Sequence, residues 1–325
     1  MLIITQKEVK KILPFKKIRE VIRAVEKAFF DWGKNLIQMP SKMYLFFKEH
    51  QGDLRIMPTY SQSLKLAGTK IVNVHPENLK RELPTVMATI LLNDPKTGLP
   101  MALIDGTLIT ALRTGAAGAV ATKYLAKKEA KTLGIVGAGI QAFTQILSIT
   151  KVRKIKEIFV YDIKRKAIKK LSQFLAKEKI KIKEGSLKEV CQKDIVSTTT
   201  PVTKPIVKGE WIRPGTHINA IGADAPGKQE LDPQILKKAK IIVDAKEQAI
   251  HSGEINVPIS KGIISEKNIF GELGEIVVGK KKGRRKEGEI TIFDSTGLAI
   301  QDLYTANLVY REARKRKLGK EIKII

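Results

Sequence analysis

The sequence predicts an α/β protein that combines a doubly wound parallel sheet with a second, α+β domain. First, an apolar run at 133–136 leads into Gly137 and Gly139 and then into a helix-compatible stretch at 143–149. Second, apolar runs alternate with helical segments through the rest of the chain, as in a parallel sheet. Third, short strand-like pieces in the N-terminal third follow one another too closely for βαβ units and predict a mixed or antiparallel sheet.

The N-terminal part is expected to begin with an amphipathic helix. Apolar residues recur at helical spacing over 15–32, after Pro14 interrupts the pattern. Strands separated by turns follow, and an Ala-rich helix then joins the two domains. We expect these strands at 42–47, 52–57, 69–74, 85–92 and 100–104, and the joining helix at 108–125.

The C-terminal part supplies the parallel sheet. A final helix over 296–317 is apolar on one side, and we expect it to return to the first domain. Beyond 133–136, strands are expected at 157–161, 195–199, 217–221, 241–244 and 289–293.

Length and composition place the chain among globular proteins. With 325 residues and 36.2 kDa it is long enough for two domains. No apolar run reaches the ~18 residues that a membrane helix needs, so no membrane partner is expected. The N-terminus lacks signal-peptide architecture, and the single cysteine, Cys191, excludes an internal disulfide. We therefore expect a cytoplasmic protein in which Cys191 is a buried apolar residue, not a catalytic one.

The net charge of +27, from 60 Lys and Arg against 33 Asp and Glu, raises the question of nucleic-acid binding. The lysines are spread along helix-like segments such as 164–179, and only 6% of the residues are aromatic, so stacking platforms are scarce. The densest basic run, 280–286, precedes a strand, which favours a solvated loop over a phosphate-binding patch. No nucleic acid is expected as a partner.

The stretch 137–142 has the chemistry of a dinucleotide site. Gly137 permits a tight turn, Gly139 lets the backbone approach a pyrophosphate, and Ala142 allows the helix to pack closely on the strand. The next strand ends in Asp162, whose carboxylate can accept hydrogen bonds from the hydroxyls of an adenosine ribose. Strand, turn, helix and acid together favour a nucleotide site over a glycine turn without a ligand.

Five stretches, in order along nearly the whole chain, resemble the ornithine cyclodeaminase and mu-crystallin family. The resemblance implies a homodimer with a split substrate and dimerisation domain, here 1–114 and 306–325, and a Rossmann domain for NAD or NADP, here 115–305. The family includes ornithine cyclodeaminases, an archaeal type of alanine dehydrogenase, imine reductases and mu-crystallin. The matching stretches are 70–78, 105–115, 134–142, 222–231 and 293–302.

The resemblance also assigns chemistry to individual residues. Arg113 matches the arginine expected to clamp the substrate carboxylate, and Lys70 matches the lysine near that carboxylate and the reacting nitrogen. Asp224 matches the aspartate taken to activate water or accept the amine proton, and Lys228 is expected to pair with it or with the substrate. Each residue has a structural alternative: an interdomain contact for Arg113, an exposed edge charge for Lys70 and a turn acid for Asp224.

Position 55 separates the members of the family. In ornithine cyclodeaminases the corresponding stretch carries an acid that pairs with the second amino group of ornithine, whereas this chain has Arg55. A guanidinium would repel an ornithine ammonium. Lys42 adds a cation and resembles the archaeal alanine dehydrogenases. Both residues favour a substrate with one amine and a carboxylate, and the alternative is that they form a solvated strand pair.

We therefore expect a reversible NAD-dependent oxidative deamination of alanine or a similar small amino acid. The alternatives are an ornithine cyclodeaminase and an imine reductase or nucleotide-binding protein like mu-crystallin. Asp162 favours NAD over NADP, although Lys164 and Arg165 leave NADP possible. The histidines show no metal-ligand spacing, so no metal is expected. Besides the glycines, Ala142 and Asp162, the expected cofactor contacts are Thr114, Ile140, Gln141, Lys164, Ser197, Thr198, Ile221, Asp224 and Ser295.

Overall fold

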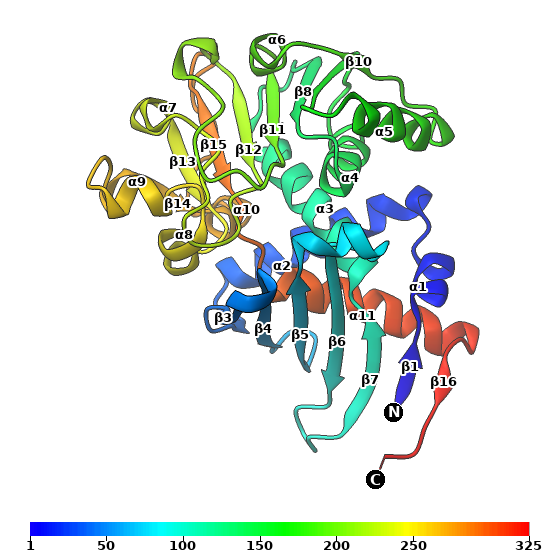
Figure 1. Ribbon diagram of the computed structural model, residues 1–325. Coiled ribbons are helices and arrows are strands. Elements are labelled where there is room, and N and C mark those ends of the chain that lie inside the picture. The colour runs from blue at the N-terminus through cyan, green and yellow to red at the C-terminus, as the bar shows by residue number, and fades with distance from the viewer. Residues whose placement is uncertain (325) are drawn as a thin grey trace. The chain divides into compact units, whose positions relative to one another are not determined.

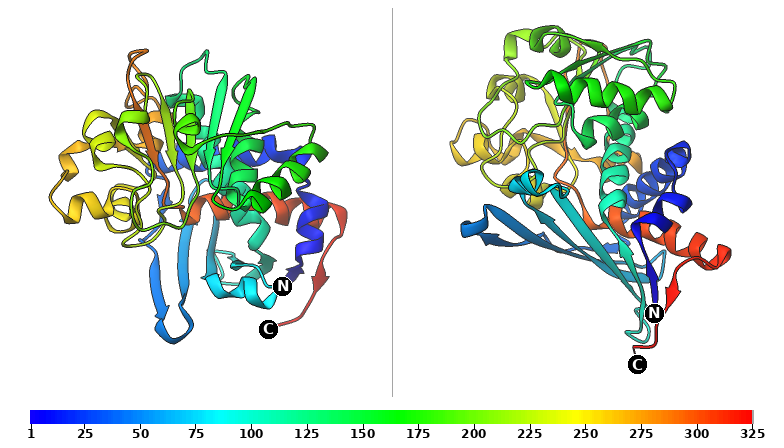
Figure 2. Two further views of the ribbon diagram at one scale, coloured as in Figure 1. Left: turned by 45° about the horizontal axis from the view of Figure 1, so that its top comes forward. Right: turned by 45° about the vertical axis from the view of Figure 1, so that its right-hand side comes forward.

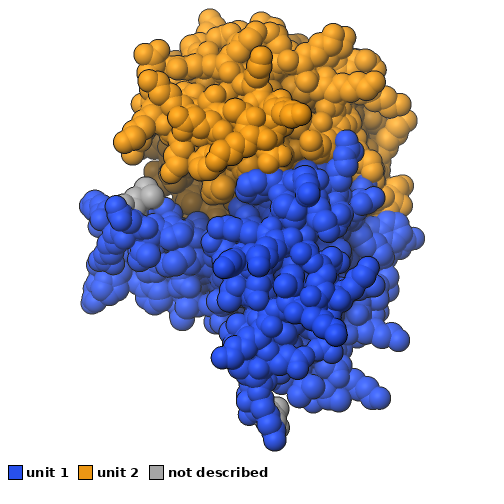
Figure 3. Space-filling model, turned by 90° about the vertical axis from the view of Figure 1, so that its right-hand side faces the viewer, with its two compact units in different colours: residues 1–113, 298–325 blue, residues 114–297 orange. Residues whose placement is uncertain are grey.

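The computed structural model describes residues 1–324, apart from the side chain of Leu79. The chain divides into two compact units, shown in different colours in Figure 3: Met1–Arg113 with Leu298–Ile325, and Thr114–Gly297. The second boundary lies earlier than the predicted one at 305/306. That predicted boundary would cut the last helix, which packs as a whole on unit 1.

Unit 1 is built on a mixed sheet. Neighbouring strands from β2 to β7 are antiparallel, whereas β1 pairs in parallel with β7. The order is β16-β1-β7-β6-β5-β4-β2, with β3 also paired to β4. The strands are β1 (Leu2–Ile4), β2 (Ile37–Gln38), β3 (Met43–Phe47), β4 (Gly52–Ser61), β5 (Leu66–Val74), β6 (Val86–Asn93), β7 (Pro100–Asp105) and β16 (Lys320–Glu321).

One face of this sheet is covered by helices. The helix α11 (Ala299–Arg316) contacts β4, β5 and β6 and also α2 (Ile18–Gly33), and Figure 2 shows α11, in red, beside these strands. The smaller α1 (Gln6–Ile12) packs on α11, and α3 (Thr107–Leu125) continues into unit 2. The last helix begins at Ala299, three residues later than predicted, because Leu298 is still extended and serves as its N-cap.

The opposite face of the unit 1 sheet is apolar and open in the described chain. Met43 on β3 lies opposite Ile56 on β4, which in turn lies opposite Ile71 on β5, and Leu45 lies opposite Leu54. Met43 is 60% exposed, and Leu45 and Ile71 are exposed as well. Such a contiguous apolar surface on a folded unit is typical of a protein interface.

Unit 2 is a doubly wound α/β domain, as predicted. Its strands are all parallel, in the order β10-β9-β8-β11-β12-β15-β13-β14. Figure 1 shows helices flanking this sheet. The strands are β8 (Thr132–Val136), β9 (Glu157–Tyr161), β10 (Lys183–Glu184), β11 (Ile195–Thr198), β12 (His217–Ala220), β13 (Lys240–Val243), β14 (Ile269–Glu272) and β15 (Thr291–Asp294).

The helices of unit 2 cover a sheet core of Val, Ile, Leu and Ala side chains. Cys191 belongs to that core, as predicted, and burial raises the pKa of its thiol to about 12. None of the helices in residues 1–324 combines the length and apolarity needed to cross a bilayer. Besides α3, the helices are α4 (Ile140–Ile149), α5 (Arg165–Lys177), α6 (Leu187–Cys191), α7 (Pro233–Lys238), α8 (Lys246–Ser252), α9 (Asn256–Ser260) and α10 (Leu273–Val277).

Sequence patterns missed the shortest elements. Strand β14 was not predicted because its four residues include Gly271, which weakens a strand pattern. The basic run 280–286 is irregular, as expected of a loop, but it is only partly solvated. Arg284 donates from Nε to the carbonyl of Leu125 over 2.7 Å and contacts Thr291 Oγ1 at 3.1 Å, so it ties the loop to the end of α3.

Candidate active site

Four cations of unit 1, Lys42, Arg55, Lys70 and Arg113, are buried, and even Lys42 is only 9% exposed. Arg55 and Lys70 project from the same face of the sheet, because Arg55 on β4 lies opposite Val72, two positions beyond Lys70 on β5. This burial excludes a solvated strand pair for Lys42 and Arg55. It also excludes an exposed edge charge for Lys70, since β5 is an inner strand.

One carboxylate on α11 joins two of these cations. Lys70 Nζ lies 2.7 Å from Asp302 Oδ2, and Arg113 Nε lies 3.0 Å from Asp302 Oδ1. Arg113 Nη1 also donates to Gln301 Oε1 over 2.9 Å. The contact between Lys70 and Asp302 has the distance of an ion pair but not the geometry of a hydrogen bond, so it is a charge–charge contact. The structure thus brings Lys70 and Arg113 to one acid.

Lys70 changes its protonation state near neutral pH. Burial lowers the pKa of Lys70, and the neighbouring Arg113 guanidinium lowers it further. Asp302 opposes both effects, Lys42 adds a smaller lowering, and the resulting pKa is about 7. Lys70 can therefore bind an anion as an ammonium and can also exchange a proton at physiological pH.

Arg55 is held by an acid and an aromatic ring. Its Nε and Nη2 lie 2.8 and 2.9 Å from the two carboxylate oxygens of Asp53. Its Cζ lies 5.4 Å from the centre of the Tyr44 ring, and Lys42 Nζ lies 5.6 Å from the same ring centre. The ring contact brings Lys42 and Arg55 together beside the cluster of Lys70 and Arg113.

The glycine turn of unit 2 lies between β8 and α4. Gly137 has a φ of 95°, which favours glycine, and its N–H donates to the carbonyl of Tyr161 over 2.8 Å. Gly139 is the N-cap of α4 and offers no side chain to the first-turn N–H groups. A Cβ added to Gly139 would meet no atom of unit 2 within 4 Å, so the protein's own packing does not require this glycine. Open space above the exposed N–H groups of α4 fits a pyrophosphate.

Asp162 follows β9 and faces this turn. One of its oxygens accepts from the Ala138 N–H and the other from the Lys164 N–H, both over 2.8 Å. The carboxylate keeps further lone pairs for ribose hydroxyls. Gly139, the α4 N-terminus and Asp162 together fit a dinucleotide.

Other predicted cofactor residues have structural partners. The Thr198 hydroxyl donates to Glu230 Oε2 over 2.6 Å, so a cofactor contact by its side chain would compete with this bond. Ser197 Oγ lies 3.4 Å from Asn219 Nδ2. The remaining predicted contacts lie in unit 2 around its sheet: Thr114, Ile140, Gln141, Ile221 and Ser295, of which Ile140 is exposed and Thr114, Ile221 and Ser295 are buried.

Asp224 lies in a loop after β12. Lys228 Nζ donates to Asp224 Oδ1 over 2.6 Å, so of the two partners predicted for Lys228 the structure shows Asp224. Both side chains are partly exposed. The buried Glu230 carboxylate accepts from the Gly222 N–H over 2.9 Å and from the Thr200 N–H over 2.7 Å, which anchors the start of the loop. The predicted catalytic residues are thus divided between the units, with Lys70 in unit 1 and Asp224 in unit 2.

Comparison with known proteins identifies the family. The ornithine cyclodeaminase/mu-crystallin family model matches residues 2–317. The chain belongs to this family. It is 48% identical over 322 residues to the alanine dehydrogenase of Archaeoglobus fulgidus, covering 99% of this chain and 98% of that one.

Two solved structures from the family are very similar. An archaeal alanine dehydrogenase dimer with bound NAD has a TM-score of 0.95 at 48% identity, covering 100% of this chain and 99% of the other. The Δ1-pyrroline-2-carboxylate reductase of Thermococcus litoralis, in complex with NADH and L-proline, has a TM-score of 0.95 at 43% identity, covering 99% of this chain and 100% of the other.

The sequence did not predict four residues that hold the site in place, namely Asp53, Glu230, Gln301 and Asp302. Asp302 lies in a stretch that carries the family resemblance, and it interrupts the apolar side of the last helix between Ala299 and Leu303. A lone acid on the apolar side of a helix signals a buried ionic partner, because burial of an unpaired charge is costly. Asp53 and Glu230 gave no comparable signal, since the sequence left open which face of the strand with Asp53 and Arg55 is buried, and Glu230 lies in a loop.

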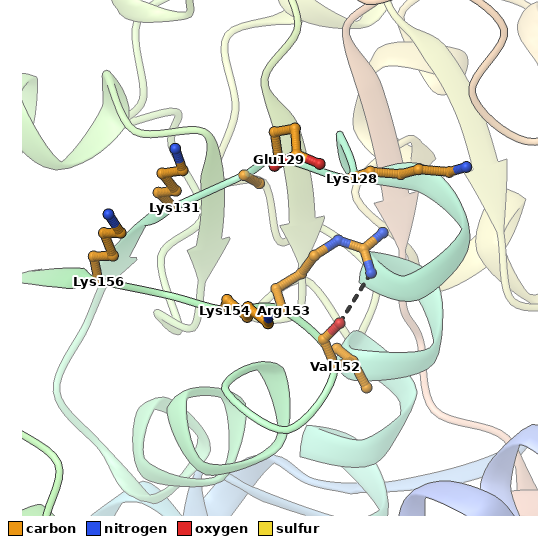
Figure 4. A pocket seen from close by; sticks show the side chains of 8 residues that line it. Lys128, Glu129, Lys131, Val152, Arg153, Lys154 and Lys156 are labelled. Atoms are coloured by element: carbon orange, nitrogen blue, oxygen red, sulfur yellow. Dashed lines mark hydrogen bonds between the residues drawn. The ribbon is translucent and has the colours of Figure 1, made fainter.

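A hollow of about 330 Å³ in unit 2 is lined mainly by basic side chains (Figure 4). It lies where the chain enters β8 and β9, whereas ligands of open α/β sheets bind beyond the other strand ends. Arg153 in this hollow donates to backbone carbonyls, among them those of Val152 and Lys127. Its guanidinium thus caps the backbone carbonyls at the C-terminal end of α3. The hollow is lined by Lys128, Glu129, Ala130, Lys131, Val152, Arg153, Lys154 and Lys156.

Proposed function

We propose that this protein is an NAD-dependent dehydrogenase that reversibly converts alanine, or a similar small L-amino acid, into its keto acid and ammonia. The observation that carries the proposal is the buried cluster of Lys70, Arg113 and Asp302 beside Lys42 and Arg55. Lys70 and Arg113 share the single carboxylate of Asp302 among the described ion pairs, and the resulting excess of positive charge suits a substrate carboxylate. The full-length similarity to an alanine dehydrogenase supports the same reaction.

The cofactor residues support NAD. The α4 N-terminus and the space above Gly139 would hold the pyrophosphate, and Asp162 would hold the adenosine ribose. Asp162 disfavours the 2′-phosphate of NADP by charge repulsion. Bound NAD supplies the acceptor for the hydride that leaves the amino-acid Cα. An enzyme that draws on NAD would work in the cytoplasm, which is the location we propose.

The remaining chemistry falls to side chains of the chain itself. Arg113 and protonated Lys70 hold the substrate carboxylate and fix the orientation of Cα. Asp224 acts as the base that removes a proton from the water attacking the imine carbon, and ammonia then leaves. Lys228 Nζ, which donates to Asp224 Oδ1 over 2.6 Å, orients that carboxylate. Oxidation of one alanine with one water thus yields pyruvate, ammonia and reduced cofactor.

We also propose a homodimer that forms through the open apolar face of the unit 1 sheet. A second copy would cover Met43, Leu45, Ile56 and Ile71, which are costly to leave in water. The similar archaeal alanine dehydrogenase was solved as a dimer. Sedimentation of the purified protein would show twice the chain mass, and a charge introduced by Leu45→Asp would shift it to the monomer.

A second candidate reaction is reduction of a cyclic imine that carries a carboxylate. The reductase of Thermococcus litoralis is 43% identical, and those of Bacillus cereus are 33–35% identical over nearly the whole chain. Arg113 and Lys70 would hold the carboxylate of such a substrate equally well. Oxidative deamination consumes water and releases ammonia, whereas reduction of a cyclic imine involves neither. Measurement of ammonia therefore distinguishes the two reactions.

The test compares substrates in both directions. We expect NADH to appear when the purified protein is given NAD with L-alanine, and to be consumed with pyruvate and ammonia. Preferred consumption of NADH with Δ1-pyrroline-2-carboxylate would favour the imine reductase. Formation of proline and ammonia from ornithine without net NADH would identify a cyclodeaminase. Binding of NAD without turnover of any of these substrates would indicate that the protein binds the nucleotide but is not one of these enzymes.

A further inference from the structure

Asp302 is the one acid in direct contact with both Lys70 and Arg113 in the described part of unit 1. It lies in the first turn of α11 and is only 1% exposed. Each of its two oxygens faces a different cation, with Oδ2 toward Lys70 and Oδ1 toward Arg113. The preceding residue, Gln301, binds the same guanidinium at Nη1. One turn of helix therefore holds both groups proposed to bind the substrate carboxylate.

The two cations could not share this buried place without an anion. Arg113 and burial both favour loss of the Lys70 proton, and Asp302 is the neighbouring group that favours its retention. Lys42 also disfavours the charge of Lys70, and Arg55, which projects from the same face of the sheet, is paired with Asp53. Asp302 is thus the counter-charge for Lys70.

Asp302 and Gln301 also fix the guanidinium of Arg113. Asp302 accepts from Nε and Gln301 accepts from Nη1, so two of the three guanidinium nitrogens already have a partner. A guanidinium held in this way enters a complex with less loss of conformational freedom than a free one. The remaining donors then meet a carboxylate in a defined orientation.

We propose that Asp302, assisted by Gln301, is a positioning residue that keeps Lys70 charged and Arg113 oriented for the substrate carboxylate. This inference rests on the proposed function, because it concerns the same site. Asp302 itself touches no reacting atom. It acts through the two cations, so its loss should weaken carboxylate binding more than it slows the chemical step.

The test compares Asp302→Asn with Asp302→Glu and Gln301→Leu. In Asp302→Asn, the Michaelis constant for pyruvate should rise about 30-fold or more at neutral pH, as expected when one partner of a buried charge pair is removed. The pH above which pyruvate binding weakens should fall by at least about one unit, since Lys70 loses its counter-charge. Asp302→Glu should restore part of both effects. Gln301→Leu should raise the Michaelis constant without moving the pH profile.

A purely structural role for Asp302 would give a different result. The affinity for NAD, which depends on unit 2, and the melting temperature serve as controls for folding. Unchanged pyruvate binding and an unchanged pH profile in folded Asp302→Asn would overturn the inference. If Asp302→Asn does not fold, Gln301→Leu decides: an unchanged Michaelis constant overturns the inference, and an increase supports it.

Failure of the proposed function can be told apart from failure of this inference. Binding of pyruvate and of Δ1-pyrroline-2-carboxylate to the NADH-loaded protein is measured by calorimetry from pH 6 to 9, alongside turnover. If the wild type binds either carboxylate but does not turn over alanine, the proposed function fails and the comparison of variants still stands. If the wild type binds neither, the carboxylate role of Lys70 and this inference fail together.

Discussion

The guanidinium of Arg55 is bound by the carboxylate of Asp53, two positions earlier on the same strand, at distances of 2.8 and 2.9 Å. Residues two apart on a strand project from the same face, so both groups face the buried cluster around Lys70. Asp53 fixes the guanidinium and offsets part of its charge. It therefore tempers the repulsion of an ornithine ammonium that Arg55 was predicted to exert.

Reversing the charge at position 55 should change the substrate. In Arg55→Glu, two acids would lie side by side, and a diamino acid would find a partner for its second ammonium. We expect kcat/KM for alanine to fall about 100-fold and binding of ornithine to improve, since charge reversal at a buried site costs several kcal/mol. The control is Lys96→Glu, an equal charge change in an exposed turn. Unchanged preference in Arg55→Glu would show that Arg55 does not contact the substrate.

A methyl group at Gly139 should weaken cofactor binding and leave the fold intact. The added Cβ meets no atom of unit 2, so the free energy of unfolding should change by less than about 0.5 kcal/mol. The same methyl would fill the space of a pyrophosphate, and the Kd for NAD should rise at least about tenfold. Gly288→Ala is the matched control, because its Cβ also meets no atom and no cofactor is expected there. Equal NAD affinity in Gly139→Ala and Gly288→Ala would place the cofactor elsewhere.

The carboxylate of Asp162 should decide between NAD and NADP. In Asp162→Ser, a hydroxyl can still accept from the Ala138 N–H, but the negative charge that would face a 2′-phosphate is gone. We expect the preference for NAD over NADP to shrink about tenfold or more, with Lys164 available to bind the phosphate. Ratios of kcat/KM for the two cofactors measure this. An unaltered ratio would mean that Asp162 does not lie beside the ribose.

His217 should make the protein sensitive to acid. It is buried between Thr291 and Asn219, with ring nitrogens 3.0 and 3.2 Å from their side-chain oxygens. Burial and then the charges of Arg284 and Arg153 lower its pKa to about 3. Because the unfolded state binds a proton near pH 6.5 and the folded state does not, stability falls as the pH drops from about 6.5 to 3, by an amount on the order of several kcal/mol.

Urea unfolding of His217→Gln at pH 7 and pH 4 tests this effect. The variant should lose less stability than the wild type between these pH values, because glutamine takes up no proton. Its stability at pH 7 will also be lower if the two side-chain contacts of His217 are lost. Only the loss of stability between pH 7 and pH 4 reports the titration of His217. An equal loss in the variant and the wild type would assign the acid sensitivity to other groups.

The fold was largely predictable because its signals are local. The glycine turn, the alternation of strands and helices in unit 2 and the closely spaced strands of unit 1 all appear as short patterns. Four strands escaped because two or three residues carry no periodicity, namely β1, β2, β10 and β16, and β14 escaped because Gly271 weakens its pattern. The predicted boundary at 305/306 differs from the division of the structure at 297/298, because that division depends on where α11 packs and not on a linker composition.

The residues proposed for substrate binding and catalysis were named only where the family resemblance reached, whereas Gly137, Gly139 and Asp162 were named from a local motif. Lys70, Arg113 and Asp224 came from matched stretches. Without the resemblance, an exposed edge charge was favoured for Lys70, an interdomain contact for Arg113 and a turn acid for Asp224. The contact between Lys70 and Asp302 joins opposite ends of the chain, so neither spacing nor periodicity could indicate it. The pairing of Arg55 with Asp53 was not predicted either, because the face of β4 that they share could have been the solvent-exposed one.

The stoichiometry of alanine oxidation tests the central claim most directly. Purified protein would be incubated with NAD and L-alanine, and NADH, ammonia and pyruvate would be measured over the same time course. The account predicts that the three products appear in equal amounts and that Lys70→Met reduces all three together. No NADH from alanine, with NADH formed instead from proline or ammonia released from ornithine without NADH, would contradict it.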